Sequence, residues 1–438
     1  MPIDRLLSKF PGAVQPPRSY VAHESGMRRI LFCALLFCFL QASYGQSPPV
    51  RAGDYPTVGN AFEALVTSDS RYVFVTVTNV DGPNYSTPDS EAGKRRHVIS
   101  GLQVFSIQAG KLHSIAFVGL RSKGANGATF LPGEKTIAVA AGDAGVAFVN
   151  VRDAIRGTAH PYFLSQGDGA GVFDVVATPD GKYVFSANEY GVLHGQLGNV
   201  GVIAVQTDSG GRVISARTLR QIPAGNKVPA LTTSPDGSRL YVVREILPPG
   251  VMPKLAGKQN PILTKHNCVQ VIGTPPDPNG LITIIDVKRA TSSNSTLPAV
   301  LGQTAAGCSP VRAVEASNAS ALYVSARGDN RILVFSPRLL ESDPDHALLR
   351  EFDSGGIAPV GIRLFSRETM LLVDNSNRFE QSAGSIAVLD ISGAAKLPLR
   401  QTIPSGEFPR DASLSSDGRF LYVANYTSRS LEVISVSP

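Results

Sequence analysis

The chain carries one pattern of apolar and polar positions seven times. Its last copy, PRDASLSSDGRFLYVANYTSRSLEVISV at residues 409–436, alternates apolar and polar positions, turns at SDG (416–418), and alternates again through 420–425 and 431–436. Alternation with a period of two predicts half-buried strands, and Asp-Gly between two such runs predicts a tight turn. The pattern therefore predicts antiparallel strands joined by short turns.

Six further segments carry the same strand–turn–strand pattern. They are ATPDGKYVFSAN (177–188), TSPDGSRLYVV (233–243), VTSDSRYVFVTV (66–77), FLPGEKTIAVAA (130–141), EASNASALYVSA (315–326) and LFSRETMLLVDN (364–375). Gly and Pro recur in the exits between units, as in IPAGNKVP (222–229) and IPSGEFP (403–409). Dividing roughly 390 residues by seven gives about 56 per unit, which suits a four-stranded blade with variable loops.

Seven such units predict an all-β fold, a seven-bladed β-propeller of four-stranded antiparallel blades. A sandwich would need Greek-key crossings, and the coils of a β-helix are far shorter. The last unit stops after its third strand, at Val436. We therefore expect residues 50–58 to supply its outer strand, beside 431–436, so that the mature N-terminus completes the last blade.

Residues 27–45 have the pattern of a secretory signal. MRR (27–29) precedes an apolar run at 30–40, and SYG (43–45) places small residues before a cut after Gly45. The run is shorter than the roughly 20 residues of a bilayer span, and no later segment could span a membrane. We expect residues 1–26 to be an extra tail or a mis-assigned start and 46–438 to be one propeller domain, periplasmic or secreted. A retained membrane anchor is the alternative.

Composition and charge exclude some classes of function. A hydrophobic content of 43% is ample for a core. The formal net charge is +6, half of which lies in residues 1–45, so what remains is too small and dispersed to follow a phosphate backbone. We therefore expect no nucleic-acid partner. His-x-x-Glu-His and Cys-x-x-Cys spacings are absent from the sequence, and we expect no metal and no cofactor.

The units resemble a known family. SPDGSRLYVV and LYVANYTSRSLEVISV are similar to the YVTN-type repeat of bacterial seven-bladed propellers, and the organisation resembles the wider lactonase-like propeller family. The chain has no Trp, which argues against WD-repeat and quinoprotein propellers. The resemblance implies that the connections from second to third strand, and those between blades, emerge on one face, which we call the loop face. The tight turns emerge on the other, the turn face.

The long connections belong to the loop face. Second-to-third connections are long at 78–100, 188–200, 244–280 and 375–384, whereas the turn face keeps tight turns throughout. We therefore expect function on the loop face. Its loops contain the candidate residues Arg96, His97, Glu189 and His194; the alternative is that the insertions merely cover the channel mouth.

Alignment of the units gives a column of charged residues at the start of the innermost strands. It reads Glu63, Gly127, Asp174, Ala230, Arg312, Gly361 and Asp411, and the following column is wholly apolar. We expect Glu63, Asp174, Arg312 and Asp411, with Arg410 beside them, to line the channel mouth. Such a set suits a small anionic or polyol ligand, with the arginine as a fixed fork for a carboxylate. The alternative is that these residues pair among themselves and cap strand ends.

The cysteines agree with export. Cys33 and Cys38 lie in the predicted signal, which leaves Cys268 and Cys308. The propeller geometry places both on the loop face of adjacent blades, so we expect a disulfide between them. Two unpaired buried thiols are the alternative.

Two function classes fit these observations. The first is an exported propeller, non-catalytic or of unknown activity, that binds a small ligand, a glycan or a protein partner on its loop face. The second, implied by the resemblance, is a lactone hydrolase in which an arginine polarises the ring carbonyl and a carboxylate or histidine activates water. Blades of that family often open with Gly-Pro-Arg-His, whereas this chain reads FPRD at 408–411. Arg410 carries over and the histidine does not, which favours binding.

Overall fold

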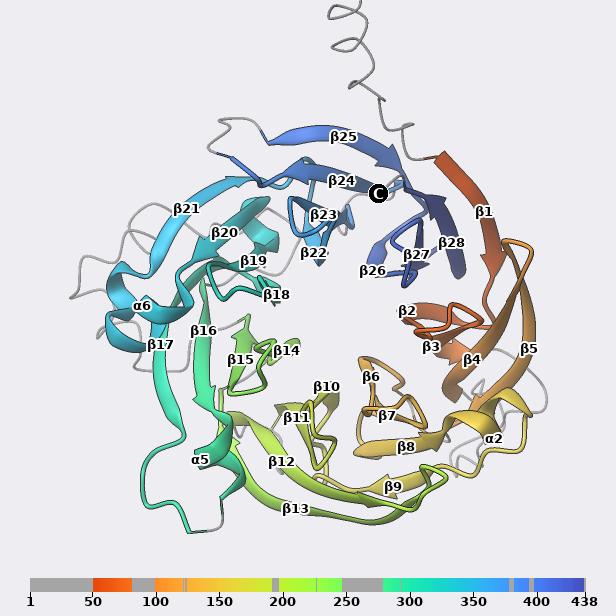
Figure 1. The fold of residues 1–438 in the computed structure, drawn as a ribbon, viewed down its shortest axis with the longest axis horizontal. Coiled ribbons are helices and arrows are strands. Elements are labelled where there is room, and N and C mark those ends of the chain that lie inside the picture. The colour runs from red at the N-terminus through yellow and green to blue at the C-terminus, as the bar shows by residue number, and fades with distance from the viewer. Residues whose placement is uncertain are drawn as a thin grey trace, which may run out of the picture. The chain divides into compact units, whose positions relative to one another are not determined.

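Seven four-stranded antiparallel sheets stand around a ring in the unit Pro48–Pro438, and the chain visits them in order (Figure 1). The structure is a computed structural model. It describes residues 50–80, 99–120, 122, 124–190, 197–225, 227–245, 279–292, 294–377, 382–393 and 398–436. The predicted fold, a seven-bladed β-propeller, is confirmed.

The first three blades each run outward from an innermost strand. Blade 1 holds β2 (Asn60–Val66), β3 (Tyr72–Val80), β4 (Ile99–Gln108) and β5 (Lys111–Gly119). Blade 2 holds β6 (Ala128–Phe130), β7 (Thr136–Ala140), β8 (Val146–Asn150) and β9 (Tyr162–Leu164). Blade 3 holds β10 (Val172–Ala177), β11 (Tyr183–Tyr190), β12 (Leu197–Thr207) and β13 (Val213–Pro223).

The next three blades repeat this order. Blade 4 holds β14 (Ala230–Thr233), β15 (Arg239–Arg244), β16 (Asn279–Asp286) and β17 (Val300–Cys308). Blade 5 holds β18 (Pro310–Glu315), β19 (Leu322–Ala326), β20 (Arg331–Phe335) and β21 (Leu348–Asp353). Blade 6 holds β22 (Pro359–Phe365), β23 (Met370–Asn375), β24 (Ser385–Asp390) and β25 (Leu399–Pro404).

Blade 7 closes the ring with strands from both ends of the unit. It holds β26 (Pro409–Leu414), β27 (Phe420–Asn425) and β28 (Ser430–Ser435), and its outer strand is β1 (Val50–Pro56). The pairing runs from Val50 opposite Ser435 to Pro56 opposite Ser430, and Figure 1 shows β1 beside β28. The expected N-terminal closing strand is thus confirmed.

The recurring turn has a side-chain cause. In four blades a hydroxyl donates a 2.6 Å hydrogen bond to the aspartate two residues later: Thr67 to Asp69, Thr178 to Asp180, Ser234 to Asp236 and Ser415 to Asp417. These bonds shape a tight turn between the first and second strands, and Gly418 supplies the positive φ of 68° that the last one needs.

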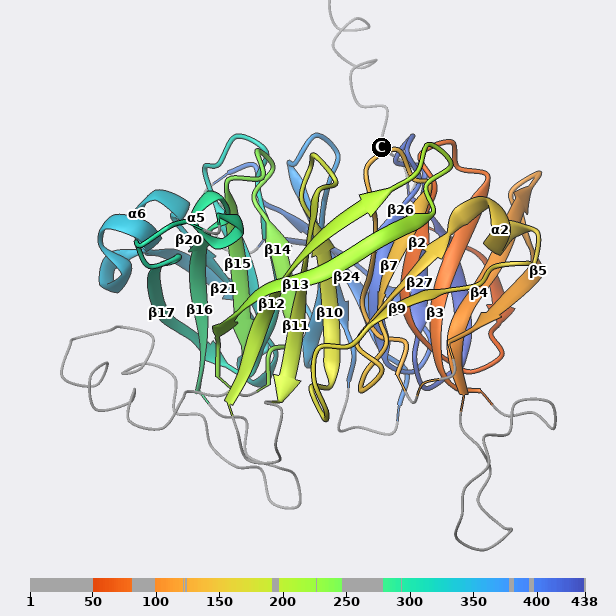
Figure 2. The same ribbon diagram turned by 90° about the horizontal axis from the view of Figure 1, so that it is seen from below.

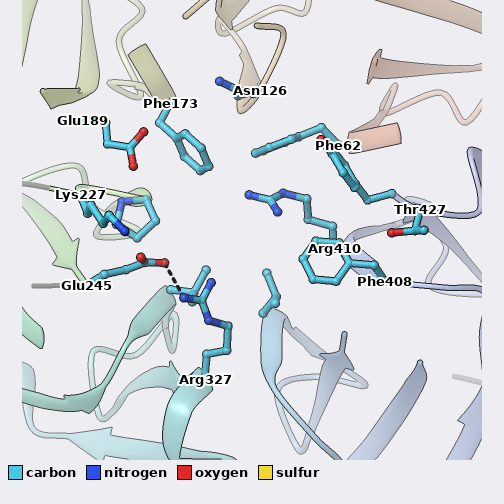
Figure 3. Close-up of a pocket in the computed structure, with 14 residues that line it drawn as sticks. Phe62, Asn126, Phe173, Glu189, Lys227, Glu245, Arg327, Phe408, Arg410 and Thr427 are labelled. Carbon is cyan, nitrogen blue, oxygen red and sulfur yellow. Dashed lines mark ion pairs between the residues drawn. The ribbon is translucent and has the colours of Figure 1, made fainter. Parts of the chain in front are cut away.

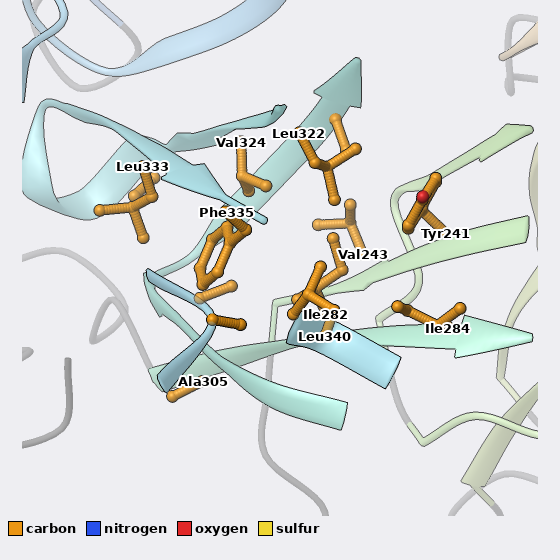
Figure 4. Packing of buried hydrophobic residues seen from close by; sticks show 14 of the residues in the cluster. Tyr241, Val243, Ile282, Ile284, Ala305, Leu322, Val324, Leu333, Phe335 and Leu340 are labelled. Carbon is orange, nitrogen blue, oxygen red and sulfur yellow. The ribbon is translucent and has the colours of Figure 1, made fainter. Parts of the chain in front are cut away.

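The core lies between neighbouring blades rather than at one centre. Figure 4 shows one such layer, where Tyr241 and Ile282 of blade 4 face Leu322 and Phe335 of blade 5, with Leu340 next to Ile282. The predicted apolar column is buried in every blade: Ala64, Ala128, Val175, Leu231, Ala313, Ile362 and Ala412. Each sheet therefore buries both faces against its neighbours.

One expectation for the turn face was wrong. Three blades carry a short helix after the third strand: α2 (Val151–Ile155), α5 (Val287–Thr291) and α6 (Pro337–Ser342), and Figure 2 shows them along one side of the ring. Asn150, Asp286 and Ser336 cap these helices by accepting from the backbone N–H three residues later. The first-to-second turns are tight, as expected, but the third-to-fourth connections elaborate this face as well. The described residues also contain two 3₁₀ turns, η1 (Arg327–Asp329) and η2 (Pro344–His346).

Among the residues described, no helix is both long and apolar enough to cross a membrane. The predicted tail and signal at residues 1–45 lie outside the described part of the chain. Export and the exact start of the mature protein therefore stay predictions.

Candidate functional site

β-bulges at the start of the innermost strands change the direction in which the first side chains point. In blade 7, Pro409 pairs with Asn425 but Asp411 pairs with Ala424, so Arg410 is the extra residue. The same one-residue shift occurs at the start of the innermost strands of blades 1, 3, 5 and 6. A bulge breaks the alternation of a strand and turns an added side chain toward the same region as its neighbour. The residue before the predicted charged column therefore also reaches the central channel.

These residues form a cavity of about 470 Å³ at the loop face, which we call the mouth cavity (Figure 3). Each blade contributes the residue that directly precedes the predicted column: Phe62, Asn126, Phe173, Pro229, Val311, Val360 and Arg410. The mouth cavity is thus built by the whole ring.

Arg410 is surrounded by aromatic rings. Its guanidinium carbon lies 3.8 Å from the ring centroid of Phe62 and 5.5 to 5.6 Å from those of Phe173, Phe408 and Tyr426. The rings hold one another edge to face, with Phe62 and Phe173 5.3 Å apart. Figure 3 shows the guanidinium reaching toward the middle of the cavity. Cation–π contacts from blades 1, 3 and 7 therefore position this charge.

The opposite wall of the mouth cavity is charged. Glu189, Lys227, Glu245 and Arg327 line it, and Figure 3 places them across the opening from Phe62. Arg327 forms an ion pair with Glu245, Nη2 to Oε1 3.1 Å, and both side chains are nearly buried. The backbone N–H of Lys227 donates to the Glu189 carbonyl, and that of Glu245 donates to the Lys227 carbonyl. Glu189, a candidate from the sequence, thus lines the same cavity as Arg410, while Arg96, His97 and His194 fall outside the described residues.

The other four predicted residues lie together in a second space. Glu63, Asp174, Arg312 and Asp411 line a cavity of about 230 Å³ further along the same innermost strands, which we call the channel cavity. Arg363 joins them there. The structure therefore groups Glu63, Asp174, Arg312 and Asp411, and places Arg410 in the mouth cavity instead. Ligand binding by either group stays a prediction.

The carboxylates of the channel cavity tie blades to one another. Glu63 accepts a 3.2 Å hydrogen bond from the backbone N–H of Ala128 in the next blade. Asp174 accepts from the backbone N–H of Leu231, also in the next blade, at 2.8 Å. These contacts cap the first backbone donors of inner strands, as the alternative interpretation of the column expects.

The arginines of the channel cavity act in the same way. Arg312 donates to the carbonyl of Pro229 at 2.7 Å, which links blade 5 to blade 4. Arg363 pairs with Asp411 at 3.1 Å and donates to the carbonyl of Ala412 at 2.7 Å, which links blade 6 to blade 7. Alignment missed Arg363 because it lies two positions after the charged column, where the other innermost strands carry uncharged residues.

Burial changes the pKa values of the carboxyl groups in and around the channel cavity. Burial raises the pKa of Glu63 well above its ordinary value, and the nearby Asp411 and Asp174 raise it further. Burial also raises the pKa of Asp374, a residue of β23, to about 7, and the Asp411 charge adds to this. The carboxyl groups of the channel cavity and its surroundings therefore release their protons at higher pH than ordinary carboxyl groups do.

Two glycines in the charged column leave room for carboxylates from elsewhere. A Cβ on Gly361 would lie 1.9 Å from Asp374 Oδ2, and one on Gly127 would lie 2.1 Å from Asp174 Oδ1. A glycine in the charged column thus indicates that another strand supplies a carboxylate at that place. The alignment considered only the charged positions of the column, and so it missed Asp374.

Cys308 is disulfide-bonded. Its expected partner, Cys268, lies outside the described residues, so the pairing stays a prediction. The backbone N–H of Arg327 donates to the carbonyl of Ser309, 3.2 Å away, which ties this segment to the mouth cavity. In the part of the chain that the structure describes, no three His, Cys, Asp or Glu residues are arranged to hold a metal ion.

Comparison with known proteins gives one finding. A family model described as "Lactonase, 7-bladed beta-propeller" matches residues 361–438, which span the last two blades and include Arg410. A search of curated proteins returns no match. Together with the seven blades of the structure, the family match confirms the resemblance to lactonase-like seven-bladed propellers.

Proposed function

We propose that the protein binds a small, ring-shaped polar molecule bearing a carboxylate or carbonyl group in the mouth cavity. The observation that carries this proposal is the Arg410 guanidinium, fixed among four aromatic rings in a cavity of about 470 Å³. Ligand pockets usually measure about 300 to 1,000 Å³. The cavity thus suits a small ligand better than a glycan chain or a protein partner.

The two walls of the mouth cavity suit different parts of such a ligand. The planar guanidinium of Arg410 offers paired donors to a carboxylate or carbonyl oxygen. The ring face of Phe173 suits the apolar face of a sugar-like ring. The carboxylates of Glu189 and Glu245 can accept hydrogen bonds from ligand hydroxyls. A sugar acid or its lactone combines all three features.

Calorimetric titration with gluconate, glucuronate and neutral glucose tests the proposal. We expect the acids to bind the wild type and Arg410→Gln to weaken that binding by about tenfold or more, because a hydrogen-bonded charge is lost. Arg410→Lys should keep part of the affinity. The matched control is Arg217→Gln, an exposed arginine on β13, which should bind like the wild type. Equal binding by the wild type and Arg410→Gln would show that the assignment is wrong.

A second candidate is hydrolysis of a lactone, which the family match over Arg410 favours. In this reaction water adds to the ring carbonyl, the ring C–O bond breaks, and a hydroxy acid is released. Arg410 would stabilise the developing oxyanion, and Glu189 or Glu245 would take the proton from water. Acid release from a lactone panel measures turnover. Loss of turnover in Arg410→Gln and in one of Glu189→Gln or Glu245→Gln would make catalysis the function.

We also propose export to the periplasm or beyond, on the strength of the charged, apolar and small-residue pattern at 27–45. Cell fractionation followed by N-terminal sequencing tests this. A mature protein beginning at Gln46 is expected, and a cytoplasmic protein that retains residues 27–45 would contradict it.

A further inference from the structure

A separate cavity opens on the turn face between blades 4 and 5. It measures about 740 Å³, larger than the mouth cavity. Its walls are the first turn of blade 4 (234–239), the end of β18 with the turn that follows it, and α6. The cavity is thus lined by elements of both blades, and α6 also packs against β17 of blade 4.

Glu315 is an exception to the repeat at this cavity. It is the last residue of β18, three positions after the charged column. The other blades place there Val66, Phe130, Ala177, Thr233, Leu364 and Leu414, none of which is charged. Burying a carboxylate at a position that the other blades fill with uncharged groups is costly unless the carboxylate is fully paired.

One oxygen of Glu315 lacks a partner. The residue is 7% exposed, and the Tyr241 hydroxyl lies near its carboxylate. Oε2 is buried and has no hydrogen-bond partner among the residues that the structure describes. Buried acceptors are almost always satisfied, so an orphan oxygen on a residue that lines a cavity indicates a missing donor.

The neighbouring charges already have partners. Arg239 pairs with Glu341, Nε to Oε1 2.5 Å and Nη2 to Oε2 3.0 Å, and lies 3.9 Å from Asp286. Asp236 accepts from the hydroxyls of Ser234 and Ser238. The missing donor of Glu315 is therefore not supplied by these groups.

We propose that this turn-face cavity is a second binding site, for a small ligand whose ammonium group donates to Glu315 Oε2. A positive donor fits better than a neutral one, because Asp236 and Glu341 stand near Glu315 and add negative charge. Arg338 lines the outer part of the cavity and is exposed to water. The site is independent of the mouth cavity and of the function proposed for it.

Binding at this site should depend on pH. Burial raises the pKa of Glu315 to about 7, Asp236 and Glu341 raise it further, and the Tyr241 hydrogen bond and Arg239 oppose the shift. An ammonium group binds the ionised carboxylate. Affinity should therefore rise between about pH 6 and pH 8, with close to a tenfold loss per pH unit on the acid side.

Calorimetric titration with ethanolamine at pH 6 and pH 8 tests the site, with ethylene glycol as the uncharged probe. Ethanolamine should bind the wild type at pH 8, and Glu315→Gln should weaken this binding about tenfold or more. Asp168→Asn, which changes an exposed aspartate outside the cavity, should bind ethanolamine like the wild type.

A second variant, Glu315→Leu, controls for loss of folding. It introduces the leucine that blades 6 and 7 carry at this position, so it should fold and still lose ethanolamine binding. Two results would overturn the proposal. One is equal binding by the wild type and Glu315→Gln. The other is absence of ethanolamine binding to the wild type at pH 8, which would leave Glu315 as a partner of Tyr241 alone.

Discussion

An ion pair joins the two strands whose pairing closes the ring, and its contribution to stability can be measured. Arg51 of β1 places Nε 2.8 Å from Oε1 of Glu432 on β28. The side chain of Glu432 is wholly buried, whereas that of Arg51 is 48% exposed. The perturbation is Arg51→Gln, which removes the charge and keeps a side chain of similar reach.

The expected loss of stability follows from the hydrogen bonds that Glu432 keeps in the variant. Its Oε2 still accepts from Ser405 Oγ at 2.6 Å and from Asn425 Nδ2 at 3.0 Å, but Oε1 loses its cation. Removing one partner of a fully buried pair costs about 3 to 5 kcal/mol. Because Arg51 lies at the edge of the sheet, where water can solvate part of the carboxylate, we expect a loss of about 2 kcal/mol in the free energy of unfolding.

Urea unfolding of four proteins measures this contribution: wild type, Arg51→Gln, Glu432→Gln and the double variant. The coupling free energy in this cycle should be about 1 to 2 kcal/mol. Asp54→Asn is the matched control, because Asp54 also pairs with Arg51, at 2.7 Å, but is 41% exposed. That exposed pair should contribute less than about 0.5 kcal/mol.

The interface between blade 7 and blade 1 also positions Arg410 in the mouth cavity. The contact of Arg410 with Phe62 crosses from blade 7 to blade 1, the interface that β1 closes. Arg51→Gln should therefore also weaken binding in the mouth cavity. Additive effects of Arg51→Gln and Glu432→Gln, or equal effects of Arg51→Gln and Asp54→Asn, would refute the reasoning that the buried carboxylate depends on Arg51.

Three further outcomes are expected. Gly361→Ala should lower the free energy of unfolding by about 2 kcal/mol or more, because its Cβ would meet the Asp374 carboxylate at 1.9 Å, and adding Asp374→Ala should recover part of that loss in urea unfolding. The pKa of Asp374 is raised to about 7, so the native state binds more protons than the unfolded state. Asp374 should thus contribute a fall of on the order of 2 to 4 kcal/mol in the free energy of unfolding between about pH 4 and pH 7. The fall measured on Asp374→Asn should be smaller by that amount, because Glu63 and Glu315 still contribute to it. Mass spectrometry of a non-reducing digest should find Cys308 linked to Cys268; a link to any other cysteine would contradict the predicted bridge.

Local chemistry in the sequence was enough to specify the fold. The alternation of 420–425 and the Ser415 to Asp417 turn depend only on neighbouring residues, so they are legible without the tertiary structure. The closing strand was also predictable, because a chain that ends after three strands of a four-stranded unit leaves an unpaired edge, and an edge needs a partner.

The repeat pattern in the sequence does not predict which side chains meet in the candidate site. A bulge adds Arg410 to the channel wall, and period-two alternation alone does not foresee it. The aromatic rings that hold Arg410 come from three different blades, and the carboxylate beside Gly361 comes from the neighbouring strand.

The physical reason for this difference lies in the range of the interactions. Turns and strands follow from bonds between residues a few positions apart, which a linear pattern records. The pKa of Glu63 and the placement of Arg410 follow from burial and from charges or rings far away in the chain. Only closure of the ring brings those groups together, so only the tertiary structure decides what the channel can bind.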